Sequence, residues 1–342
     1  MDNPLSNEYI GKAIDHLVSY LGVKESLGST KLEEMYNTEE IERGVRHIAF
    51  QLGLPIQIHL VYGEKNIQSA GLARTDAAGH GMEGVIAQVD IPQYLPKYGS
   101  KDLTHFPIKI FIGSGYRQQV PTLFAIIAHE LSHVVLHSLS SQHKQDEFYT
   151  DLVAPILGLS PVIEMGRKVI KTVLNNNMTQ TQTITYGYLT DEQFVFAKDK
   201  IRRILEERKA TKIKTDAEIL ELKRLCDITK EKFGQFEKYL EKLDKHPKTK
   251  IAETDAHRLI LFHQGAYVDE VKNIIRECER YVSRMSVLIA RTVHYTSKNL
   301  NLLESFRDRT IKIAGKLIAR SSALDEDIKL IKKSIGLMGR IT

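Results

Sequence analysis

Cysteine is scarce in this 342-residue chain. Its two cysteines, Cys226 and Cys278, lie far apart in the sequence and form no CxxC pair. Such spacing argues against a disulfide framework and against a cysteine-ligated metal site. A chain of this length can bury a sizeable hydrophobic core, so folding alone requires neither disulfides nor a metal ion. We therefore expect two half-buried thiols on helices.

Long apolar runs are also missing. No segment reaches the roughly 18 consecutive apolar residues of a membrane-spanning helix. The first residues, MDNPLSNEYIGK, lack the basic start and apolar stretch of a signal peptide. We therefore expect no membrane span and a cytoplasmic location. The hydrophobic fraction of 42% and the charged fraction of 27% are typical of soluble globular proteins.

The charges are distributed unevenly along the chain. Residues 191–342 contain 33 Lys and Arg against 24 Asp and Glu, a net charge of +9. Residues 1–190 contain 15 basic and 19 acidic residues, a net charge of −4. This asymmetry, together with a change in pattern near residue 190, predicts two domains, 1–190 and 191–342.

The first half mixes helical and strand patterns, which predicts an α+β domain with a small mixed sheet. Apolar residues at helical spacing predict helices over 6–21, where Gly22 ends the helix, and over about 38–52. Runs rich in β-branched residues predict strands over 56–62, 84–91 and 107–113. Two further helices are expected, one beginning near Pro121 and one over 146–159. The polar stretch 175–187 is interpreted as a linker or flexible loop.

Almost all of the second half is predicted to be helical. A heptad seam runs through Val271, Ile275, Cys278, Val282, Met285, Ile289 and Thr292, and continues loosely through Leu303, Phe306, Thr310, Ile313 and Leu317. Pro247 breaks the helices within 244–250. We expect an all-α bundle or coiled coil whose seam is intramolecular, with self-association as the alternative. Because the basic residues are interspersed with acidic ones, we expect no nucleic-acid binding.

One motif in the first half indicates metal chemistry. His129, Glu130 and His133 form an HExxH sequence inside the strongly apolar stretch 121–138. Residues four apart share a helix face, so the two histidines can bind one Zn²⁺ ion. Glu130 adjoins the first ligand and can act as general base toward a water on the metal. The alternative is that these are hydrogen-bonded core residues without a metal.

A catalytic zinc usually has a third protein ligand. The metzincin arrangement is excluded, because Leu136 and Leu139 occupy the positions where it requires Gly and His. His137 lies two helical turns from the first motif histidine and cannot share its ion. His143 lies in a polar loop and is a weak candidate.

The stretch DEFYTDLVAP offers better candidates. Glu147 and Asp151 are four apart, hence on one face of the next predicted helix. We expect Glu147 to be the third ligand and Asp151 to accept the free ring N–H of one zinc histidine. Direct ligation by Asp151 remains the alternative, as does a pair of solvated acids at a helix start.

These motifs resemble those of a known group of enzymes. AHELSH followed by ExxTDL is similar to the gluzincin zinc metallopeptidases, whose pattern is HExxH and then ExxxD on a later helix. HELSHVVLH with DEFYTDLVAPIL is also similar to ImmA/IrrE-type peptidases, although Ser132 stands where they usually have Gly and Thr150-Asp151 where they have Ala-Asn. The TD form is closer to bacterial HExxH proteins with a downstream GYL segment, here 187–189. The resemblance covers about 40–200.

The resemblance implies zincin-type active-site helices and a cleft beside the small sheet. An edge strand, either PIKIFIG or GVIAQVDI, would pair with the substrate backbone. A downstream tyrosine, Tyr186 or preferably Tyr188, would stabilise the oxyanion. We therefore expect a zinc metallopeptidase that cleaves a protein or peptide substrate, in which the C-terminal helices regulate or recruit. The alternative is a non-catalytic zinc-fold scaffold with a basic helical module that binds protein or nucleic acid.

Overall fold

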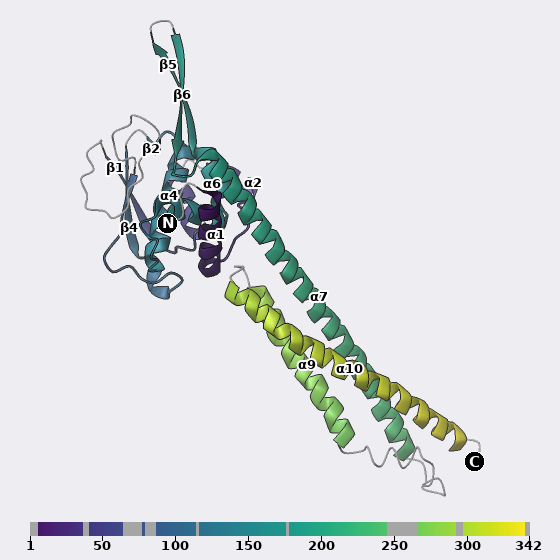
Figure 1. Cartoon of the computed structure of the whole chain (residues 1–342). Helices are drawn as coiled ribbons and strands as arrows, with labels where there is room; N and C mark the ends of the chain where they lie inside the picture. The colour runs from purple at the N-terminus through teal and green to yellow at the C-terminus, as the bar shows by residue number, and fades with distance from the viewer. Residues whose placement is uncertain are drawn as a thin grey trace. The chain divides into compact units, whose positions relative to one another are not determined.

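The computed structural model describes residues 6–36, 41–63, 77–78, 87–113, 116–175, 178–244, 266–291 and 297–338. The chain forms two compact units: unit 1 comprises residues 1–207 and 294–297, and unit 2 comprises 208–293 and 298–342. The long helix α7 (Asp191–Asp244) begins in unit 1 and ends in unit 2. The boundary proposed from the sequence, between residues 190 and 191, falls at the start of α7, whereas the units divide within it. Helices dominate beside small sheets, so the fold is α+β (Figure 1).

Unit 1 begins with the helix expected from the sequence. Ser6 caps α1 by accepting a hydrogen bond from the Tyr9 backbone N–H, and Gly22, with φ 75°, ends it. The other helices of unit 1 before α7 are α2 (Ser29–Tyr36), α3 (Ile41–Gln51), a short 3-10 helix η1 (Lys101–Leu103), α4 (Val120–Ser138), α5 (Glu147–Ala154), the π-helical segment η3 (Pro155–Leu159) and α6 (Ser160–Gly166). The expected helix over 146–159 is thus α5 continued by η3, in which Leu157 and Gly158 have non-helical backbone angles and interrupt the helix. Helix α2 was not predicted.

Unit 1 contains a three-stranded mixed sheet. Its strands are β1 (Gln57–Gly63), β3 (Ala87–Asp90) and β4 (Pro107–Gly113), in the order β1-β4-β3. β1 is parallel to β4, and β3 is antiparallel to it. The three predicted strands are therefore present, although residues 84–86 lie outside the described part of the chain. Because β4 is the central strand, the expectation that PIKIFIG could be a substrate-binding edge is wrong, and β3 is the edge strand of the two.

The alternation of β4 explains which of its faces is buried. Ile108, Ile110 and Ile112 are fully buried, whereas Pro107 and Lys109 on the other face are exposed. Alternate side chains of a strand point to opposite faces, so the three isoleucines all lie on the core side. They belong to the same hydrophobic cluster as the inward residues of helix α4.

A second sheet corrects one prediction. Strands β2 (Ala77–Ala78), β5 (Lys168–Asn175) and β6 (Met178–Tyr186) form an antiparallel sheet in the order β2-β6-β5. Most of the stretch interpreted as a linker is therefore β6. Its alternation of Thr with Gln lacks the apolar–polar pattern of a half-buried strand, but its Thr and Ile residues are β-branched and favour the extended conformation.

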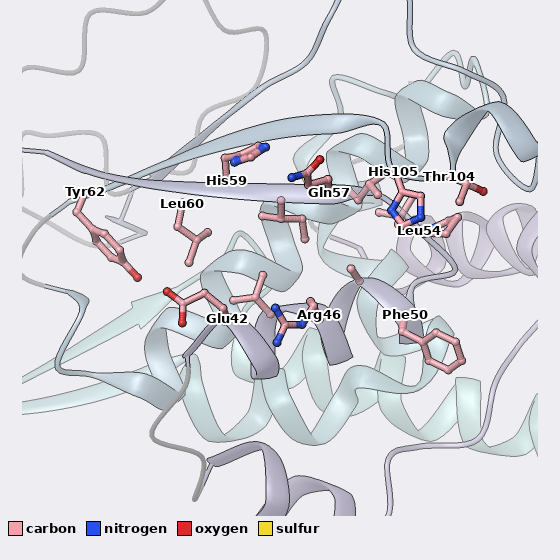
Figure 2. A pocket seen from close by; sticks show the side chains of 15 residues that line it. Glu42, Arg46, Phe50, Leu54, Gln57, His59, Leu60, Tyr62, Thr104 and His105 are labelled. Atoms are coloured by element: carbon pink, nitrogen blue, oxygen red, sulfur yellow. The ribbon is translucent and has the colours of Figure 1, made fainter.

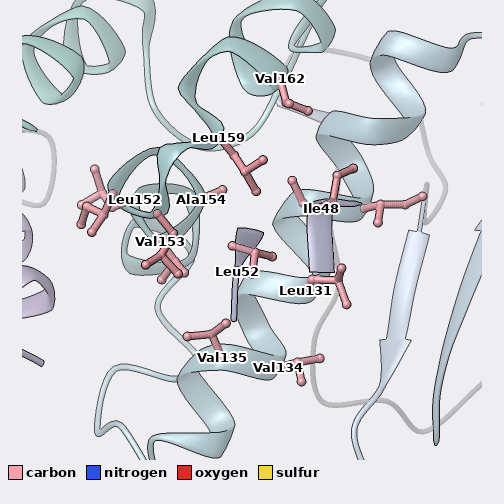
Figure 3. Close-up of a cluster of buried hydrophobic side chains, with 14 of the residues drawn as sticks. Ile48, Leu52, Leu131, Val134, Val135, Leu152, Val153, Ala154, Leu159 and Val162 are labelled. Atoms are coloured by element: carbon pink, nitrogen blue, oxygen red, sulfur yellow. The ribbon is translucent and has the colours of Figure 1, made fainter. Parts of the chain in front are cut away.

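Helix α4 lies in the middle of the unit 1 core and contacts α3, α5, α6 and β3. Almost every side chain from Thr122 to Leu136 is buried. Figure 3 shows Leu131, Val134 and Val135 of α4 among apolar side chains of neighbouring segments, including Leu52, which follows α3, and Leu152 of α5. The location of the helix explains its composition, because a helix that is apolar on all sides must be surrounded by other elements.

Two segments are long and apolar enough to cross a membrane by length and composition. They are Val120–Ser138 and Glu147–Gly166, whose most apolar windows are 83% and 67% buried inside the fold. Core helices of folded domains meet the same criteria, so their burial within unit 1 accounts for their apolar character.

Unit 2 contains the remainder of α7 together with α9 (Ala266–Arg291) and α10 (Ser297–Met338). The predicted seam is its core: Val271, Cys278 and Leu317 are fully buried, and the cluster also includes Ile275, Met285 and Ile313. The side chains of Thr292 and Leu303, and the helix-breaking Pro247, lie outside the described residues. Both cysteines are free thiols, as expected, but they are buried rather than half-buried.

Candidate metal centre

Helix α4 carries three polar residues of the HExxH motif into the core. The exposed fraction is 5% for His129, 0% for Glu130 and 1% for His133. Burial of polar groups is unfavourable unless each finds a partner, so this cluster requires an explanation. The apolar residues around it hold the helix in place and exclude water from most of its surface.

Helix α5 supplies the acidic residues. Asp146 caps it, because its Oδ1 accepts hydrogen bonds from the backbone N–H groups of Phe148 and Tyr149. Glu147 is the first residue of the helix and Asp151 lies one turn later. Both carboxylates face α4, where each approaches a histidine.

Three ligand atoms converge between the two helices. Glu147 Oε2 lies 3.2 Å from His129 Nε2 and 3.4 Å from His133 Nε2. All three atoms are buried, and none has a hydrogen-bond partner. Two donors bound to one tetrahedral zinc at about 2.0–2.1 Å lie roughly 3.3 Å apart. The two carboxylate–imidazole distances match that spacing, and all three atoms lie within 4.8 Å of one another, so the group could hold a metal ion.

The opposite nitrogen of each ring shows which tautomer is present. Asp151 Oδ1 lies 2.7 Å from His129 Nδ1, so the ring donates its Nδ1–H to the carboxylate. Thr150 Oγ1 lies 3.3 Å from His133 Nδ1 and donates its own proton to the Asp146 carbonyl, so it accepts from that ring. Both histidines therefore present an unprotonated Nε2 to the centre when they are neutral, as a metal ligand must.

Sequence reasoning assigned Asp151 to this orienting position but missed Thr150. A threonine before the aspartate has no distinctive spacing of its own. Only the packing of α5 against α4 brings its hydroxyl to His133. The approach of Asp151 to Nδ1, and of Glu147 to Nε2, gives the two acids different geometric roles.

The charges of the centre are strongly coupled. Burial alone lowers the pKa of His129, but the interactions with Asp151 and Glu147, together with the charge of Glu130, outweigh burial and raise it to about 10. Burial raises the pKa of Glu147, but the two imidazoles outweigh that effect and lower it to about 2. Without a metal ion, a proton on His129 balances the acidic groups. A divalent cation would replace that proton.

Glu130 points from α4 toward the sheet. Its Oε2 accepts a hydrogen bond of 2.9 Å from the backbone N–H of Val89 in edge strand β3. The general-base candidate is thus connected to the edge strand, whereas its neighbour His129 faces α5. Adjacent helix residues point in different directions, which explains this division.

The GYL segment holds Asp151 from the other side. Asp151 Oδ2 accepts hydrogen bonds from the backbone N–H groups of Tyr188 and Leu189. Gly187 has φ 95°, and a Cβ at that position would lie 3.0 Å from the same oxygen. Glycine therefore permits both the turn and the close approach. The backbone donors fix the carboxylate that orients His129.

The two tyrosine candidates lie in different surroundings. The Tyr188 ring is stacked on the His129 ring, with centroids 6.2 Å apart and an interplanar angle of 23°. Tyr186 is 5% exposed, and its ring packs edge-on against Tyr116. Of the two, Tyr188 is next to the centre, and Tyr186 is a packing residue.

The other histidine candidates are not part of the ligand cluster. Among the described residues, the group of possible metal ligands consists of His129, His133 and Glu147. His143 stacks on Tyr149 with ring centroids 4.0 Å apart. Burial lowers the pKa of His137 to about 4, so this side chain is neutral near pH 7.

A pocket of about 660 Å³ lies elsewhere in unit 1, between α3 and strand β1 (Figure 2). Its lining includes Arg46, Phe50, His59 and His105, and none of the metal-centre residues. The pocket therefore does not extend the candidate metal centre.

Comparisons of the chain with protein families, with curated proteins and with solved structures found no match. The arguments for function are therefore the geometry and chemistry of the centre itself.

Proposed function

We propose that this protein is a zinc-dependent peptidase. The observation that carries the proposal is the convergence of three buried, unpartnered donor atoms on two helices, next to a buried glutamate. His129, His133 and Glu147 would hold the metal. Two imidazoles and one carboxylate are a common ligand set of catalytic zinc, which retains a further position for water or substrate.

A zinc ion bound there would acidify water and polarise the scissile carbonyl. Glu130 would take the proton from the attacking water and pass it to the leaving amine. Asp151 keeps His129 in the tautomer that binds metal, and Thr150 does the same for His133. This division of roles is similar to that of the gluzincins, which the sequence resembles.

An extended substrate would lie along edge strand β3. In the described sheet, β1 and β3 are the two outer strands, and it is the Val89 N–H of β3 that is directed toward Glu130. A peptide added at this edge would therefore pass beside the general base. Tyr188, stacked on His129, is the side chain we assign to the oxyanion.

The first experiment measures metal content and hydrolysis together. We expect about one zinc per full-length chain by elemental analysis, and cleavage of a quenched fluorescent casein. Glu130→Gln should retain zinc and lose cleavage, whereas His129→Ala should lose both. His47→Ala, at an exposed histidine of α3, is the matched control and should change neither.

The outcomes separate the possibilities. Equal cleavage by Glu130→Gln and the natural chain would remove the peptidase proposal. Zinc bound stoichiometrically without any cleavage would favour the non-catalytic scaffold. Failure to bind zinc after dialysis against micromolar zinc would remove the metal centre itself.

A further inference from the structure

A groove of about 510 Å³ lies between helices α9 and α10 of unit 2. Its floor is apolar and includes Met285, Leu288, Leu302 and Phe306. Leu302 is 39% exposed, so part of this floor is open to solvent. A hydrophobic floor that is partly open is a feature of surfaces that bind another protein.

Arginines line the α9 side of the groove. Arg276, Arg280 and Arg284 are exposed and lie four residues apart, on one face of the helix. None of them forms an ion pair with another described residue. On a helix, four residues correspond to about 6 Å along the axis, so the three guanidinium groups form a regularly spaced row.

The arginines of α10 whose side chains the structure describes are paired. Arg307 pairs with Glu218, Arg309 with Glu277 and Arg320 with Glu270. Of these pairs, Arg309 and Glu277 also line the groove, so the groove contains one arginine–glutamate pair beside the unpaired row. The three unpaired arginines lie beside the partly open apolar groove. The mixed charges of the sequence do not reveal which arginines are paired and which are not.

We propose that this groove binds an amphipathic, acidic helix of a partner protein. The partner's apolar face would cover the floor, and Asp or Glu at four-residue intervals would meet the arginine row. In a partner helix lying along α9, residues four apart are also about 6 Å apart along the axis. Carboxylates can form bidentate hydrogen bonds with arginine guanidinium groups. Nucleic acid would use the arginines but not the apolar floor, so the combination favours a helix.

A designed peptide tests this proposal with the full-length chain. The probe is a fluorescent helix with a leucine stripe and Glu at four-residue intervals beside it. The reference peptide has the same composition with the Glu positions shuffled. By fluorescence anisotropy, we expect the triple variant Arg276→Ala, Arg280→Ala, Arg284→Ala to bind the probe at least tenfold more weakly.

Two controls separate the groove from general charge. The triple variant Lys223→Ala, Lys238→Ala, Lys312→Ala removes equal charge from exposed positions outside the groove and should leave binding unchanged. Leu302→Ser should weaken binding without changing the charge. Circular dichroism should show the same helix content in every variant.

Several results would overturn the proposal. Equal binding of the shuffled peptide, or equal loss in the lysine variant, would indicate nonspecific charge attraction. Tighter binding of a 20-nucleotide single strand, lost in the arginine variant, would identify a nucleic-acid site instead. A homodimer that dissociates on arginine replacement would mean that a second copy covers the groove.

Discussion

The two units treat buried polar groups differently. In the bundle of unit 2, Thr229 and Thr310 each donate to a carbonyl one turn earlier in the same helix. The buried thiols of Cys226 and Cys278 each lie 3.9 Å from a carbonyl of the facing helix. These polar groups are satisfied within the protein and leave the apolar seam intact.

Unit 1 leaves donor atoms unsatisfied. The Nε2 atoms of His129 and His133 and the Oε2 atom of Glu147 lie together without a hydrogen bond, while the opposite ring nitrogens are held by Asp151 and Thr150. Unpartnered buried polar atoms are unfavourable, so their concentration in one place indicates a ligand. The comparison of the two units indicates that a candidate functional site can be recognised where buried polar atoms lack hydrogen-bond partners.

Of the changes considered, removal of the metal should lower the stability of the protein most. The effect should depend on the metal-binding group of unit 1. If zinc is present at about a thousand times its Kd, it stabilises the folded state by about 4 kcal/mol. Calorimetry should therefore show a lower melting temperature in excess chelator. His129→Ala is the control, since the chelator should leave its melting temperature unchanged. If the chelator lowered the melting temperature of that variant equally, it would not be acting through the unpartnered atoms of unit 1.

Loss of an orienting group should have a smaller effect than loss of a ligand. Asp151→Asn can no longer accept the His129 Nδ1–H through a charged oxygen, and we expect zinc affinity to fall about 10- to 100-fold. Thr150→Val should lower it less, because a neutral hydrogen bond is weaker. Competition with a fluorescent zinc chelator measures both. A larger loss for Thr150→Val than for Asp151→Asn would contradict this assignment.

The sequence predicted much of the centre because helix spacing is a local property. Residues four apart share a face, so HExxH and the pair Glu147 and Asp151 could be assigned to facing helices. The same periodicity predicted the seam of unit 2. Strand β4 was predictable because its isoleucines alternate with residues of the other face.

Other features depend on contacts that side-chain patterns do not encode. Thr150 reaches His133 only because two helices pack together. The hydrogen bonds that hold Asp151 come from backbone N–H groups in a loop. Strand β6 has polar residues on both faces, so its alternation carries no hydrophobic signal. Its pairing with β5 is visible only in the folded chain.

A substitution in the bundle tests whether its buried polar groups contribute to stability without affecting zinc binding. The Tyr281 hydroxyl donates to the Phe306 carbonyl at 2.6 Å and lies 2.8 Å from Thr310 Oγ1. Tyr281→Phe should lower the free energy of unfolding by about 1–2 kcal/mol, measured in urea. Zinc affinity should not change. A change in zinc affinity as large as that of Asp151→Asn would contradict the separation of the units.

His137 offers the smallest and most discriminating test within unit 1. Its Nε2 is also buried and unpartnered, but it lies outside the ligand group. Because burial lowers its folded pKa to about 4, its neutral form is favoured in the folded state. The resulting stability is present above the unfolded pKa of about 6.5 and is lost as the pH falls toward 4.

Since His137 is only half-buried, solvent screening should limit this effect to somewhat under 1 kcal/mol. We expect His137→Gln to lose less stability than the natural chain between pH 7.5 and pH 5.0, measured by urea unfolding in chelator. His47→Gln, at an exposed position, should follow the natural chain. His137→Gln should also retain zinc. Loss of zinc in this variant would mean that His137 also contributes to metal binding. The candidate centre would then include a residue outside the group of His129, His133 and Glu147.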